Sequence, residues 1–198
     1  MAPTGTVAGV AELPRIAVLA SGEGTNLQAL IDRLHRESVE IVAVGGDKPG
    51  ARAFERAALA GIPTRAFQLA DYDDRHARDA AIAAWIRDQT ATTVVLAGYM
   101  ALLTPGFIAA FPNHIVNVHP SLLPAFPGLR AIEQALEAGS PTTGVTVHLV
   151  DDGVDTGPVL LQRELVIPPG ATAADVRALL APIEHELLCE AVSDLARR

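Results

Sequence analysis

Cysteine and lysine each occur only once in this chain of 198 residues, as Cys189 and Lys48. A single cysteine excludes an intrachain disulfide, which fits a reducing cytoplasm. Aromatic residues are also few, at 4%, and the net charge is −8. The chain therefore has no basic stripe with interleaved aromatics, and nucleic acid is not expected as a partner. An anionic ligand would have to be met locally, by backbone amides and single arginines.

Long apolar runs are absent as well. The longest, Val94–Leu103, is about half the length that a membrane helix needs. Residues 1–14 lack the basic region of a signal peptide and are expected to form a flexible tail. The hydrophobic fraction of 49% is enough for a sizeable core in one domain over residues 15–198. We therefore expect a cytoplasmic protein without membrane contact.

Apolar strand-like and amphipathic helix-like segments alternate over most of the chain. This alternation predicts an α/β fold with a Rossmann-like, doubly wound, mostly parallel sheet. The predicted strands are Arg15–Ala20, Val39–Gly45, Thr64–Leu69, Thr92–Gly98 and Ile115–Val118, and the predicted helices are Leu27–Glu37, Ala51–Ala60, Arg75–Gln89, Pro105–Pro112 and Arg130–Ala138.

The pattern changes after Gly139. Gly144–Val150 alternates with period 2, and a turn-rich loop separates it from a further strand, Val159–Ile167. We expect these two strands to form an antiparallel hairpin added to the parallel sheet. Ala171–Arg198 is expected to form a long C-terminal helix.

The segment SGEGTN, residues 21–26, lies between the first strand and the first helix. Strand, glycine-rich turn and helix form the layout of a phosphate-binding unit, in which amides at the helix N-terminus favour an anion. The segment matches neither the dinucleotide fingerprint nor the Walker loop. A plain tight turn remains the alternative. If a phosphate binds here, the side chain of Glu23 is expected to point to solvent.

The segment IVNVHPSLLPAFPG, residues 115–128, carries two polar residues at the end of a strand. Asn117 and His119 are two positions apart, so their side chains share one face. An amide can donate to an oxyanion, and an imidazole can move a proton near neutral pH. Acyl transfer is therefore one interpretation, and two side chains that only satisfy backbone groups are the other. His148, which alternates with apolar neighbours, is predicted to be an ordinary strand residue.

Four motifs occur in a characteristic order: SGEGTNLQALID, LAGYM, NVHPSLLPAFPG and GVTVHLVDDGVDTGPVLLQ. Together they resemble the phosphoribosylglycinamide formyltransferase family of purine biosynthesis, and the resemblance covers residues 15–198 as a single formyltransferase domain. It implies formyl transfer from N10-formyltetrahydrofolate, a cosubstrate, to the amine of glycinamide ribonucleotide, with no metal. Asn117, His119 and Asp155 fall on the family's catalytic trio, in which a carboxylate beside the imidazole favours its charged form.

The resemblance also implies substrate contacts. For the nucleotide, the matching residues are Gly24, Thr25, Asn26 and Glu184; for the folate, they are Arg75, Met100, Ala101, Leu102, Leu103 and Asp151. Ala101 stands where relatives usually have an arginine, which matters little if the contact is made by the backbone. The partners are thus small molecules, and a homodimer is compatible with the resemblance.

Three other functions remain to be separated. Formyltetrahydrofolate hydrolases share the trio but carry an N-terminal regulatory domain, which residues 1–14 are too few to form. Methionyl-tRNA formyltransferases need a C-terminal RNA-binding domain and a basic surface. A catalytically inactive phosphate-binding module would bind nucleotide without turnover.

Overall fold

The computed structural model describes residues 12–197, so most of the expected flexible tail lies outside the described residues. The elements in chain order are β1 (Arg15–Leu19), α1 (Thr25–Arg33), β2 (Glu40–Gly46), α2 (Arg52–Leu59), β3 (Thr64–Ala66), a 3₁₀ turn η1 (Leu69–Asp71), α3 (Arg75–Asp88), β4 (Thr93–Leu96), α4 (Pro105–Ala110), β5 (Ile115–His119), α5 (Ala131–Glu137), β6 (Thr142–Leu149), β7 (Val159–Val166) and α6 (Ala173–Ala196).

The strands form one seven-stranded sheet in the order β3-β2-β1-β4-β5-β6-β7. The first five are parallel, and β6 and β7 form an antiparallel hairpin beside β5. The expected doubly wound sheet with an added hairpin is therefore confirmed. β3 is shorter than predicted, because its partner β2 ends at Gly46, whose carbonyl accepts the last sheet-like bond from the Phe67 amide at 2.8 Å.

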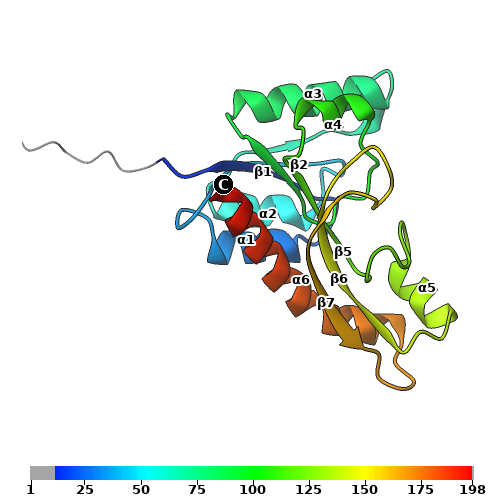
Figure 1. Ribbon diagram of the computed structural model, residues 1–198. Coiled ribbons are helices and arrows are strands. Elements are labelled where there is room, and N and C mark those ends of the chain that lie inside the picture. The colour runs from blue at the N-terminus through cyan, green and yellow to red at the C-terminus, as the bar shows by residue number, and fades with distance from the viewer. Residues whose placement is uncertain (1–11, 198) are drawn as a thin grey trace, which may run out of the picture.

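Helices cover both faces of the sheet. Figure 1 shows α3 and α4 together on one side, and α1, α2 and α6 on the other. Side chains of β1 alternate between these layers: Ile16 and Val18 pack in the core beneath α1 and α6, and Ala17 and Leu19 pack beneath α3. Burial on both faces explains why the central strands are almost wholly apolar.

The carboxyl ends of the parallel strands carry the motifs that the sequence singles out. β1 runs into SGEGTN, β4 into residues 97–104 and β5 into the proline-rich loop 120–128. β1 and β4 are neighbours, and the chain leaves them toward opposite faces of the sheet. In open α/β sheets, ligands bind at such a reversal of strand order. Among residues 12–197, no helix has the length and apolar character required to span a membrane.

Candidate active site

Asn117 and His119 lie at the carboxyl end of β5 and share one of its faces, as predicted. The loop between β6 and β7 brings Asp155 against both of them. The Nδ1 atom of His119 is 3.2 Å from Oδ2 of Asp155, and Nδ2 of Asn117 donates to Oδ1 of Asp155 at 3.4 Å. The other imidazole nitrogen, Nε2, is 2.9 Å from the carbonyl oxygen of Phe126. The three predicted residues therefore converge on one point.

The loop that carries Asp155 is fixed from within. Asp151 accepts hydrogen bonds at Oδ1 from the Thr156 hydroxyl at 2.7 Å and from the Gly153 amide at 3.1 Å. Asp155 itself has a φ of 55°, in the left-handed region that Asp and Asn tolerate better than most residues. This backbone conformation turns the carboxylate toward β5.

The Asp155 carboxylate is surrounded by donors. Burial alone would raise its pKa, but the hydrogen bond from His148, the Gly128 amide at 2.8 Å and the charges of His119 and His148 outweigh that effect. The pKa of Asp155 is thereby lowered from 3.8 to about 2. Asp155 is consequently an anion throughout the neutral range.

This lowered pKa predicts a pH dependence of stability. Since folding favours the carboxylate, its contribution is complete above pH 4 and is lost as the pH falls through about 2. The shift corresponds to about 2 kcal/mol of unfolding free energy. Urea unfolding of wild type and Asp155→Asn should therefore show wild type losing about 1.5 kcal/mol relative to the variant between pH 5 and pH 2.5, with the remainder lost at lower pH. Parallel curves for the two proteins would contradict the assignment.

His148 belongs to the same cluster, although the sequence predicted an ordinary strand residue. Its Nε2 atom is 3.2 Å from Nδ2 of Asn117 and 3.5 Å from Oδ1 of Asp155. Its Nδ1 atom is 2.9 Å from the Leu149 carbonyl oxygen, as expected of a satisfied strand histidine. The imidazole thus supports both the strand and the site. The pairing of β5 with β6 places His148 opposite Asn117, and this register is the information that would have revealed the role of His148 in the site.

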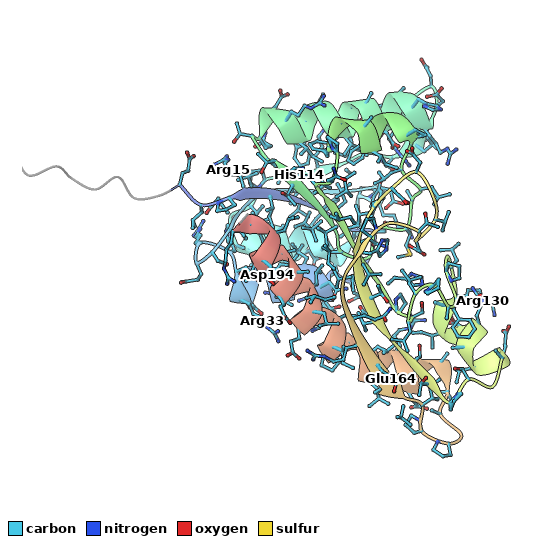
Figure 2. All side chains as sticks on the ribbon, in the orientation of Figure 1. Arg15, Arg33, His114, Arg130, Glu164 and Asp194 are labelled. Carbon is cyan, nitrogen blue, oxygen red and sulfur yellow. The ribbon has the colours of Figure 1, made fainter. Side chains whose placement is uncertain are left out.

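A cavity of about 610 Å³ opens beside this cluster. The trio and His148 line it. All six residues predicted to contact folate line it too: Arg75, Met100, Ala101, Leu102, Leu103 and Asp151. On the side of α5, where Figure 2 labels Arg130, the wall also includes Glu133 and Arg177. Among residues 12–197, the His, Cys, Asp and Glu side chains form no group of three or more placed to hold a metal ion.

The residues predicted to contact the nucleotide form a separate group that does not line this cavity. Gly24 is the N-cap of α1, and the Asn26 side chain donates to Oε2 of Glu184, on α6, at 3.1 Å. Burial raises the pKa of Glu184, against the hydrogen bond from Asn26 and the charges of Arg177 and His119. Since α6 packs against β5, the two groups lie on neighbouring elements. As expected, the Glu23 side chain points to solvent, with 72% of its surface exposed.

Gly24 predicts a position-specific loss of stability. It has a φ of 69°, and a Cβ there would lie 2.7 Å from Cα of Ala53. Gly24→Ala is therefore expected to lower the free energy of unfolding by about 2–4 kcal/mol. Gly22→Ala is the matched control, because a Cβ on Gly22 meets no heavy atom within 4 Å. Equal unfolding midpoints for the two variants in urea would refute the argument.

The sequence matches a family model and named relatives over most of its length. The formyl transferase family model matches residues 14–192. The chain is 39% identical to phosphoribosylglycinamide formyltransferase of Bacillus subtilis, over 88% of this chain and 90% of that one. It is 40% identical to the trifunctional purine biosynthetic protein adenosine-3 of Drosophila pseudoobscura pseudoobscura, covering 92% of this chain but spanning only 14% of that protein.

Solved structures of similar proteins share the fold of this chain. The crystal structure of glycinamide ribonucleotide transformylase 1 from Symbiobacterium toebii superimposes with a TM-score of 0.91 at 43% identity, covering 95% of this chain and 90% of that chain. On this evidence, the chain belongs to the formyl transferase family.

Proposed function

We propose that this protein transfers a formyl group from N10-formyltetrahydrofolate to the amino group of glycinamide ribonucleotide, a step of purine biosynthesis in the cytoplasm. The observation that carries the proposal is the convergence of Asn117, His119 and Asp155 on the wall of a cavity of about 610 Å³. Relatives named phosphoribosylglycinamide formyltransferase support it, because this chain covers 82–90% of several of them.

In this reaction the nucleotide amine attacks the formyl carbon, and the carbonyl electrons move onto oxygen. The tetrahedral intermediate then breaks its bond to N10, which takes a proton as tetrahydrofolate leaves. Asn117 supplies an N–H to the developing oxyanion. Its present bond to Asp155, at 3.4 Å, is at the weak end of hydrogen-bond lengths, so this donor can turn to the substrate at small cost.

His119 supplies positive charge at the same point. Both of its ring nitrogens face acceptors, the Asp155 carboxylate at 3.2 Å and the Phe126 carbonyl at 2.9 Å. Only the imidazolium form can donate to both. The charged ring stabilises the oxyanion, and it can pass a proton between the amine and N10. Asp155, whose pKa is lowered to about 2, is an anion beside this ring in the neutral range.

The two substrates are assigned to adjoining regions. The free amides at the start of α1, at Thr25 and Asn26 beside Gly24, suit the nucleotide phosphate. Glu184, held by Asn26 at 3.1 Å, suits the ribose hydroxyls. The folate is assigned to the cavity between Arg75, residues 100–103 and Asp151.

One assay tests the proposal against its alternatives. The protein is mixed with N10-formyltetrahydrofolate, and folate absorbance is followed with and without glycinamide ribonucleotide. Turnover that requires the nucleotide is the expected result. Turnover with water alone would identify a hydrolase instead. No turnover, with nucleotide binding retained, would leave a binding module.

A further inference from the structure

Two adjacent charged residues of α3 are buried completely, outside the cluster described above. Arg78 is 3% exposed and Asp79 is 0% exposed. Charged side chains are almost never buried to this extent unless they are paired. Here the Arg78 guanidinium donates through Nε and Nη2 to Oδ1 of Asp79, at 2.9 and 2.7 Å. Both hydrogen bonds within the pair go to Oδ1, so Oδ2 of Asp79 is left for another donor.

Two further hydrogen bonds of this pair hold a single loop, residues 98–104. Oδ2 of Asp79 accepts the backbone N–H of Thr104 at 2.7 Å. Nη2 of Arg78 donates to the Leu102 carbonyl at 3.3 Å. The pair therefore fixes the C-terminal half of the loop from below, and it does not line the cavity itself.

The other half of the loop is fixed from a different element. The Met100 amide donates to Oγ of Ser21 at 2.9 Å, and the Ser21 amide donates to the Gly98 carbonyl at 3.2 Å. Residues 98–104 contain no helix or strand. Their conformation thus depends on Ser21 at one end and on the buried pair at the other.

This loop forms one wall of the cavity, which residues of the Asp155 loop also line. Met100 and Leu102 are exposed by 58% and 62%, and residues 98–103 all line the cavity. Within residues 12–197, the backbone amides of Ala101 and Leu103 donate no hydrogen bond. A flat heterocycle with donors and acceptors along its edge would find both apolar surface and free backbone groups here.

We propose that the Arg78–Asp79 pair positions this wall and so sets the affinity for the pteridine ring of the folate. The inference rests on the proposed function, since that function places a folate in this cavity. Arg78 and Asp79 are positioning residues: they act through the loop backbone and touch neither substrate. A displacement of the wall by about 1 Å is enough to lose well-directed contacts.

The test must avoid leaving one buried charge alone, because that would unfold many proteins. The double variant Arg78→Met/Asp79→Leu replaces both charged side chains by apolar ones of similar volume, a change that proteins often tolerate. The loop then loses the hydrogen bonds that the pair makes to the Thr104 amide and the Leu102 carbonyl. The matched control is Arg163→Met/Glu186→Leu, which deletes an ion pair at 2.6 Å between β7 and α6, remote from the loop.

The full-length variants are compared by steady-state kinetics, by titration with tetrahydrofolate and by amide hydrogen exchange. We expect the double variant at α3 to raise the KM for formyl folate and the Kd for tetrahydrofolate about tenfold, because a displaced wall loses well-directed contacts to the pteridine ring. The KM for the nucleotide and kcat at saturating folate should stay within about threefold of wild type. Exchange of the Thr104 amide should accelerate, and the control should match wild type.

Two results would overturn the inference. Unchanged tetrahydrofolate affinity despite faster exchange at Thr104 would show that the Arg78–Asp79 pair does not determine the affinity of the cavity wall for the pteridine ring. An equal rise in both KM values would show a general structural role. Failure of the proposed function can be told apart from failure of this inference. If the proposed function is wrong, wild type shows no nucleotide-dependent turnover, but the tetrahydrofolate titration still compares wild type with the variant. If wild type does not bind tetrahydrofolate, both the proposed function and this inference are wrong.

Discussion

Replacing His119 by alanine is expected to lower kcat by about a hundredfold or more, the usual contribution of a positioned acid or an oxyanion donor. The imidazole lies 3.2 Å from Asp155 at the cavity wall, and alanine leaves the oxyanion without that charge. The KM values should change much less, because His119 is assigned no part in holding either substrate. Initial rates at saturating concentrations of both substrates measure the effect.

His114→Ala is the matched control for this experiment. Figure 2 labels this residue, which directly precedes β5, so that it stands at the opposite end of the strand from His119. Its side chain is exposed, and its Nδ1 atom is 2.8 Å from the nearby Pro112 carbonyl oxygen. The control should retain wild-type kcat. A His119→Ala variant with near-normal kcat would remove the imidazole from the mechanism.

Part of this site could be predicted from the chain alone. Asn117 and His119 could be placed together because residues two apart on a strand share a face. Asp155 could be placed only through the family resemblance. It reaches His119 because the β6–β7 hairpin returns across the end of β5, and that depends on tertiary pairing.

His148 shows the limit of periodicity. Alternation in Gly144–Val150 indicates which side chains share a face, but it does not reveal which residue of another strand lies opposite. In the structure, the β5–β6 register pairs His148 with Asn117. A one-residue change in that register would place Val147 or Leu149 there instead.

Arg78 and Asp79 show a second limit. Adjacent charges on a helix normally indicate a solvated face, so the sequence pattern gives no reason to expect either residue to be buried. Both charges are buried because the loop after β4 supplies a backbone amide and a carbonyl to complete their hydrogen bonds. Partners this distant in the chain leave no local signal in the sequence.

Asp155→Asn is expected to lower kcat by about a hundredfold or more as well. Asparagine tolerates the φ of 55° and keeps the shape of the side chain, so the fold should be retained. What is lost is the negative charge 3.2 Å from Nδ1 of His119. Without it Nδ1 faces a neutral amide, and the ring that meets the oxyanion has no anionic partner.

A matched control separates the loss of this particular carboxylate from a general change of net charge. Asp88→Asn, at the exposed C-terminal end of α3, removes the same charge remote from the site and should behave as wild type. An Asp155→Asn variant with near-normal kcat would remove the carboxylate from the mechanism.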